Sequence, residues 1–147
     1  MLSPAAAFNT AREDLIRNAS GLAAAMGLAV VRLYVEPEED APLPYILHGE
    51  DDIDVTGDDD CGHEAEVTAT VKWWSKAKGT QALDKGAQAR AIGAILVDVL
   101  VDDFAVTGWV IHEAELLSEG YSTDPDQSTR GRLVVRYLLT QAIESEA

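Results

Sequence analysis

Carboxylates are the side chains of this chain most able to do chemistry, and half of them are crowded into one segment. Thirteen of the 26 Asp and Glu residues lie between Glu36 and Glu66, where no Lys or Arg occurs. The formal net charge of the whole chain is −15, so this segment carries most of it. Such an excess repels itself, and it needs water, cations, a basic partner or a use for repulsion.

The spacing of these carboxylates approaches a calcium-binding loop without completing one. With Asp52 at position one of an EF-hand, Asp54 falls at position three and Asp60 at position nine. The bidentate Glu needed at position twelve is His63, and the apolar residue expected at position eight is Asp59. The flanking segments also read as strands rather than helices. Asp52, Asp54 and Asp60 are the candidate ligands if a divalent cation binds, but a solvated loop is the favoured interpretation, and we expect no metal or other cofactor.

The remaining reactive residues do not form a catalytic set. Cys61 and His63 are too few for zinc, which usually takes three or four ligands, and the carboxylates around Cys61 disfavour its thiolate. Alternation along a strand would place His112 and Glu113 on opposite faces. Neither a Gly-x-Ser-x-Gly elbow nor a phosphate-binding glycine loop occurs. We therefore expect no enzymatic activity.

Length and composition limit the kinds of protein that this chain can be. A chain of 147 residues, 47% of them hydrophobic, fits one domain with its own core, so we expect a single domain over residues 1–147. The acidic balance argues against gripping nucleic-acid phosphates. The single Cys61 excludes an internal disulfide, and the longest apolar stretch, Ala87–Val101, contains Arg90 and Asp98 and is too short to span a bilayer. We expect a soluble product made in the cytoplasm, with no membrane contact and no targeting signal.

Hydrophobic periodicity predicts an α+β fold, with a mainly antiparallel sheet of about four to five strands packed against two helices. Apolar residues at spacings of three and four predict a first helix from Ser3-Pro4 to Gly27. A second helix is expected from Gly79-Thr80, with Thr80 as its N-cap, to Asp103. The acidic run is interpreted as a hairpin arm or mobile loop at about 48–63. The expected strands are Ala29–Val35, Leu43–Leu47, Glu64–Trp74, Val106–Glu119 and Thr129–Gln141.

Some residues are candidates for an interface rather than for chemistry. Successive side chains of a strand point to opposite faces, so only one of Trp73 and Trp74 can enter the core. An outward Trp74 is either an interface anchor or covered by the chain's own loops, and the pattern favours neither. The other interface candidates are the basic Arg130, Arg132 and Arg136 and the acidic Asp51, Asp58 and Asp59.

Several short motifs occur in a recognisable order. Leu43–Ile46 reads Leu-Pro-Tyr-Ile, Val71–Ser75 reads Val-Lys-Trp-Trp-Ser at the end of a strand, and a long helix is expected from near Gly79. A strand around Trp109–Leu117, an Asp-Pro-Asp turn and Arg130–Val135 at the start of the last strand complete the order. In this order the chain resembles the tail-terminator (tail completion) proteins of tailed phages and gene transfer agents, over most of its length.

The resemblance implies a structural virion protein without catalytic residues. Proteins of this family are small α+β domains that assemble with themselves into a hexameric ring. The ring caps the tail tube, ends its polymerisation and provides the surface that joins the head. The implied partners are other copies of the chain, the tail tube protein and head-tail connector proteins, while DNA passes through the channel without specific binding. The implied location is the tail end nearest the head, reached by assembly in the host cytoplasm.

Other functions stay open at this point. A head-side connector or completion subunit shares the size and the lack of chemistry, and a divalent-cation-binding module would use the acidic run. Within the ring, the acidic run either faces passing DNA and repels it or docks on a basic neighbour.

Overall fold

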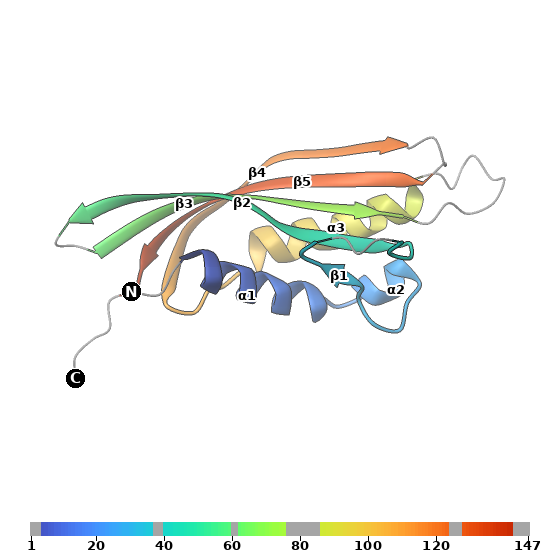
Figure 1. Ribbon diagram of the computed structural model, residues 1–147, viewed down its shortest axis with the longest axis horizontal. Helices are drawn as coiled ribbons and strands as arrows, with labels where there is room; N and C mark the ends of the chain where they lie inside the picture. The colour runs from blue at the N-terminus through green and yellow to red at the C-terminus, as the bar shows by residue number, and fades with distance from the viewer. Residues whose placement is uncertain (1–3, 37–39, 60–61, 76–85, 124–127, 143–147) are drawn as a thin grey trace.

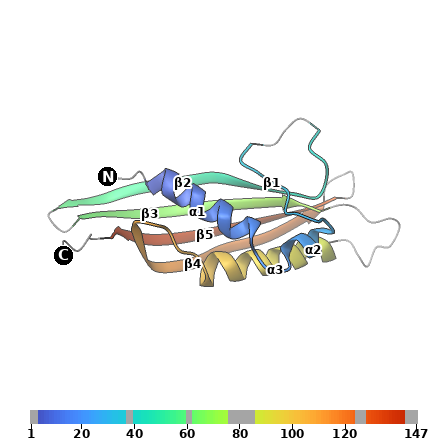
Figure 2. The same ribbon diagram turned by 90° about the horizontal axis from the view of Figure 1, so that it is seen from below.

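The computed structural model describes residues 4–36, 40–59, 62–75, 86–123 and 128–142, and it omits the side chains of 56–59, 62 and 63. Within these ranges, three helices lie on one face of a single five-stranded sheet, and no described helix lies on the other face (Figures 1 and 2). None of the described helices is long and apolar enough to cross a membrane. The elements are α1 (Pro4–Arg17), α2 (Leu22–Met26), β1 (Leu33–Tyr34), β2 (Tyr45–Asp59), β3 (Gly62–Trp74), α3 (Ala87–Asp102), β4 (Trp109–Thr123) and β5 (Thr129–Gln141).

The sheet has the strand order β1-β2-β3-β5-β4. Only β1 pairs in parallel, with β2, and the other neighbours are antiparallel. The predicted α+β class with a mainly antiparallel sheet is therefore confirmed, although the structure has three helices where two were expected.

Along β3 and β5, every second residue points toward the helices and is buried. Ala65, Val67, Ala69, Val71 and Trp73 of β3 are all at most 4% exposed, as their predicted alternation requires. The equivalent residues of β5 are equally buried, namely Leu133, Val135, Tyr137 and Leu139. These side chains form the core beneath the helices, so the remaining side chains of both strands define the outer face of the sheet.

The helix α3 packs closely on the sheet through Gly93. An added Cβ at Gly93 would lie 2.9 Å from Cζ2 of Trp73 and would collide with the Tyr121 hydroxyl. The Trp73 indole also donates a 2.8 Å hydrogen bond to the Ala89 carbonyl. Ile92, Leu96 and Leu100 form the buried stripe, whereas Ile95 and Val99, which the periodicity also predicts for it, are half-buried. The described helix begins at Ala87 after the N-cap Gly86, and the expected N-cap Thr80 lies outside the described residues.

The predicted first helix is wrong as one element, because the chain turns between α1 and α2. The helix α1 ends at Arg17, and Gly21, which adopts a left-handed φ of 82°, is the N-cap of α2. The helix α2 closes at Gly27, also left-handed, where the sequence predicted the end. In α1 the buried positions are Pro4, Phe8, Arg12 and Ile16, so an arginine occupies the centre of the core-facing stripe.

The segment before β3 departs from its predicted form. The expected strand Ala29–Val35 contracts to the two residues of β1. The acidic run forms much of β2, which pairs with β3 to the last described residues before the turn. A β-bulge between Leu47 and Glu50 adds one residue to β2, and Gly49 there has a φ of 109°, which favours glycine.

Candidate functional site

The outer face of the sheet presents its side chains in rows, because paired residues of neighbouring strands lie side by side. One row contains Lys72 of β3, opposite Arg132 of β5, and the next contains Trp74 opposite Arg130. Gly120 and Ser122 of β4 continue these two rows. Lys72, Arg130 and Arg132 thus gather three positive charges at one end of this face, and this set is called the basic end.

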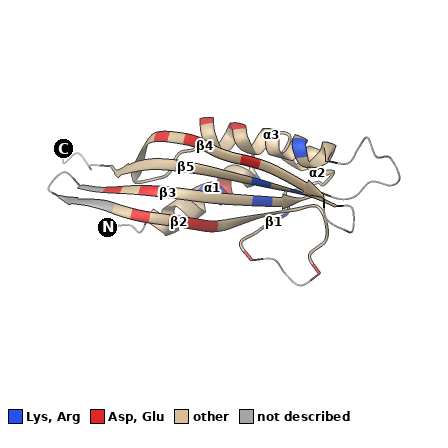
Figure 3. Ribbon diagram, turned by 90° about the horizontal axis from the view of Figure 1, so that it is seen from above, with Lys and Arg blue, Asp and Glu red and all other residues tan. Residues whose placement is uncertain are grey.

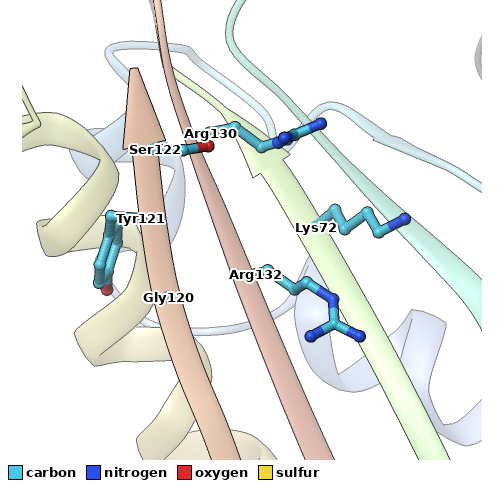
Figure 4. Close-up of a pocket in the computed structure, with 6 residues that line it drawn as sticks. All are labelled: Lys72, Gly120, Tyr121, Ser122, Arg130 and Arg132. Atoms are coloured by element: carbon cyan, nitrogen blue, oxygen red, sulfur yellow. The ribbon is translucent and has the colours of Figure 1, made fainter. Parts of the chain in front are cut away.

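The basic end surrounds an open pocket of about 350 Å³. In Figure 4, the Lys72, Arg130 and Arg132 side chains extend from β3 and β5, while Tyr121 points toward α3. Lys72 forms a 3.1 Å ion pair with Glu50 of β2. Within the described parts of the chain, neither Arg130 nor Arg132 has a carboxylate within ion-pair distance. Within the described residues, the pocket is therefore an anion-attracting surface in which neither Arg130 nor Arg132 is paired with a carboxylate.

The opposite end of the outer face is acidic. A row there places Asp54 of β2 beside Glu66 of β3 and continues through Leu138 to Glu113 of β4. Figure 3 shows acidic residues concentrated toward this end and basic residues toward the other. The acidic end is defined here as Asp52, Asp54, Glu64, Glu66, Glu113 and Glu115.

Arg136 lies within the acidic end, in the row of Asp52 and Glu115, and its charge is neutralised locally. Its Nη2 is 2.6 Å from a carboxylate oxygen of Glu115, and its Nη1 is 3.8 Å from one of Glu66. Among the described residues, Arg136 has carboxylate partners within its own chain, whereas the two arginines of the basic end do not. It offsets only part of the negative charge of the acidic end.

Trp74 lies on the outer face beside the basic end, as its position in the strand predicts. It is half-buried, and its ring stacks on Tyr45 at 4.9 Å between centroids with an interplanar angle of 25°. Tyr45 in turn meets Tyr34 edge to face at 5.8 Å. One side of the ring is thus covered by the chain's own Tyr45, and the role of Trp74 as an interface anchor stays a prediction.

Asp51 belongs to the interior rather than to the acidic surface. The bulge at Gly49 turns Asp51 toward the helices, where its carboxylate receives two hydrogen bonds from the Arg12 guanidinium, one of them 2.9 Å long. The Arg12 side chain is fully buried and that of Asp51 is 10% exposed. Asn9 accepts a further hydrogen bond from Arg12 at 3.0 Å. The sequence pattern did not identify Arg12, because an arginine in an amphipathic helix is normally predicted to face solvent.

His48 completes this buried cluster. Arg12 Nε donates a 2.9 Å hydrogen bond to His48 Nδ1, so Nδ1 accepts and the ring proton resides on Nε2. Among the described residues, His48 Nε2 has no hydrogen-bond partner. Burial, followed by the adjacent Arg12 charge, lowers the pKa of His48 from 6.5 to about 4. The imidazole is therefore neutral at pH 7 and serves as an acceptor that fixes Arg12.

The acidic residues considered for calcium are placed along a strand. Asp52 and Asp54 are exposed residues of β2 on its outer side, and no three His, Cys, Asp or Glu side chains within the described ranges are arranged to hold a metal ion. Asp58 and Asp59 end β2, but their side chains are not described, and Asp60 lies outside the described residues. The two aspartates that can be placed lie in extended backbone rather than in the calcium loop whose register they approached.

His112 does not follow the simple alternation used to separate it from Glu113. A register shift lies between Ile111 and Glu113, so one residue of β4 has no direct partner in β5. His112 is exposed, and its Nε2 lies 2.6 Å from the Thr140 hydroxyl. The contact is a surface hydrogen bond between neighbouring strands. His112 also shares an open pocket of about 280 Å³ with Glu64 and Glu66, and in the described structure its ring is hydrogen-bonded to neither carboxylate.

Comparison with known proteins adds two matches. The family described as Tail completion protein gp17 matches residues 13–140. A chain in the structure described as the virion of native gene transfer agent (GTA) particle superposes with a TM-score of 0.71 at 23% identity, and the match covers 95% of this chain and 99% of that chain. No sequence among the curated proteins matches. At this identity the structural match shows a shared fold.

Proposed function

Because the chain belongs to the tail completion protein gp17 family, we propose that it is the subunit of a ring that caps the tail tube, ends its polymerisation and forms the surface on which the head joins. The family match over residues 13–140 carries this proposal. A structural role in the tail of a phage or phage-like particle follows from the membership itself. The finer role, namely capping by a ring at the head-proximal end, is the part proposed here.

The fold supports an assembly role. All three helices cover one face of the sheet, so the outer face is left for contacts with neighbours (Figure 1). That face carries a basic end and an acidic end rather than a converging set of acid–base groups. A likeness to a chain of a gene transfer agent virion is consistent with placement in a virion.

The proposed partners are other copies of the chain, six in a closed ring, the tail tube protein and the head-tail connector. DNA crosses the ring without specific binding, and the net charge of −15 agrees with that, because it disfavours adhesion to phosphates. We assign no catalytic residue and no cofactor. The chain acts as one domain, in which the described residues 48–59, 62 and 63 belong to two paired antiparallel strands.

Removing the chain from the particle that carries it tests this role. We expect tails of uncontrolled length and heads without tails, and complementation with the wild-type gene should restore both. Electron micrographs give tail length and head attachment together. If tail length stays normal while only joining fails, the chain is instead a head-side connector subunit, and the terminator proposal is wrong.

A further inference from the structure

We propose, resting on the ring described above, that neighbouring copies of this chain dock through the outer face of the sheet, with the acidic end of one copy on the basic end of the next. The interface is thus between two different patches of the same chain. The following paragraphs give the charges and the geometry that support a second copy as the occupant.

Each end of the outer face holds like charges in direct opposition. Lys72 is paired across the strands with Arg132, and Asp54 is paired with Glu66. Like charges opposite one another destabilise a sheet, and the chain's own Glu50 and Arg136 offset only one member of each pair, Lys72 and Glu66 respectively. A partner of the opposite sign would relieve both, and the other end of a second copy provides that sign.

The two ends are far enough apart to bind different neighbours. Six residues of β5 separate Arg132 from Leu138, which shares the row of Asp54 and Glu113. At roughly 3.3 Å per residue, the two rows are about 20 Å apart. This distance exceeds the screening length of about 8 Å in physiological salt, so each end acts on its own neighbour. Contacts between two unlike patches repeat from copy to copy and close into a ring when the rotation permits.

The position of the acidic end favours head-to-tail contact. It lies toward the side of the sheet where β2 and β3 extend beyond the start of α1 (Figures 1 and 2). Val55, on the helix-side face of this extension, is 49% exposed, so no helix covers it there. A projecting hairpin can reach the basic end of the next copy, and Arg130 and Arg132 have no carboxylate within ion-pair distance in the described parts of their own chain.

Charge reversal of each end tests the proposal. One variant carries Arg130→Glu and Arg132→Glu, and the other carries Asp54→Lys and Glu113→Lys. All four residues are exposed on the outer face and have no ion pair among the described residues, so folding should be retained. As a matched control, Asp98→Lys and Asp102→Lys make the same charge change as the acidic-end variant on exposed positions of α3.

Sedimentation velocity of the purified chain at low and high salt is the measurement. We expect wild type and control to form assemblies larger than dimers at high protein concentration, and added salt should dissociate them. Each reversed variant alone should self-associate at least about tenfold more weakly, because like charges then meet. An equimolar mixture of the two variants should restore assembly, as should one chain with all four substitutions, because opposite charges face one another again.

Four results would overturn the proposal. The first is a wild type that is monomeric at every concentration, and the second is a pair of reversed variants that associate as strongly as wild type. The third is an equimolar mixture of the two variants that does not assemble. The fourth is an assembly that stops at dimers, which would indicate a two-fold face-to-face pair. Loss of binding to a DNA duplex in the basic-end variant, with unchanged self-association, would assign the basic end to phosphates instead. Tail length in particles is a separate readout: normal capping with failed rescue rejects only this interface, whereas a chain absent from tails rejects the proposed function.

Discussion

Two arginines of this chain have opposite surroundings. Arg12 of α1 packs against the helix-covered face of the sheet, and Arg132 of β5 lies on the outer face. Arg12, beneath the helices, is fully buried and donates to Asp51, His48 and Asn9. Arg132, on the outer face, is exposed and has no carboxylate within ion-pair distance in the described residues. The inner cation is fully used in holding helix to sheet, whereas the outer cation is available to a partner. Burial and pairing, rather than residue type, therefore separate residues of the fold from residues of the surface.

Removing the inner cation should have the largest effect. Arg12→Met leaves Asp51 and His48 buried without their partner, so we expect a loss of about 3–5 kcal/mol in the free energy of unfolding. Urea denaturation measures it. The matched change Arg17→Met removes an exposed pair with Glu13 and should cost less than about 1 kcal/mol. Equal losses in the two variants would contradict the assignment of Arg12 to the fold.

Acid should weaken the inner cluster through His48. The folded state holds the pKa of His48 at about 4, while the unfolded chain has the ordinary 6.5. Below pH 6.5 the unfolded state binds the proton first, so stability falls as the pH drops toward 4, by about 3 kcal/mol at most. Urea denaturation at several pH values follows this contribution. His48→Gln should lack it, and an identical pH dependence in this variant would exclude His48 as its source.

Gly131 and Gly120, in neighbouring strands, show how much space for a side chain each face of the sheet leaves. A Cβ on Gly131 would collide with the buried Trp73 indole on the inner face, whereas a Cβ on Gly120, on the outer face, meets nothing within 4 Å. We expect Gly131→Ala to cost about 1–3 kcal/mol and Gly120→Ala to leave stability nearly unchanged. Thermal unfolding of the two variants gives the comparison. A silent Gly131→Ala would show that Trp73 can move aside.

The smallest effect on stability should come from the outer cation. Arg132→Gln removes an exposed charge opposite Lys72, so we expect a change within about 0.5 kcal/mol, with a slight gain from reduced repulsion. Urea denaturation, with Arg12→Met as the reference, checks it. A loss above about 1 kcal/mol would mean that Arg132 supports the fold and would remove the contrast between the two faces.

Local pattern was sufficient to predict much of the fold. The strands β3 and β5 are buried on one face and the buried stripe of α3 repeats every fourth residue, so their periods are visible in the sequence. The break at Gly21 was not predicted, because a glycine weakens a helix without specifying a left-handed turn. The bulges in β2 and β4 also escaped, since alternation carries no mark of an inserted residue.

Predicting which residues meet on the outer face requires the pairing register of the strands in addition to the hydrophobic pattern of the sequence. The sequence named Arg130 and Arg132 as interface candidates, but only strand pairing brings Lys72 beside them. Asp51 was grouped with the acidic surface, because the partner that draws it inward is 39 positions away. A long-range pair of this kind has no local signature.

The bulge at Gly49 changes which residues of β2, the even-numbered or the odd-numbered, face the helices. Before it, the even-numbered Ile46 and His48 face the helices, and after it the odd-numbered Asp51 and Ile53 do. Deleting the inserted residue would leave Leu47 and Glu50 two positions apart, as Lys72 and Thr70 are on β3, so Asp51 would keep its inward position beside Arg12. A single-residue deletion between Asp51 and Val55 would instead exchange the faces of the residues beyond it and turn the Asp54 carboxylate inward. The bulge therefore tolerates the loss of one residue, whereas the regular part of the strand does not.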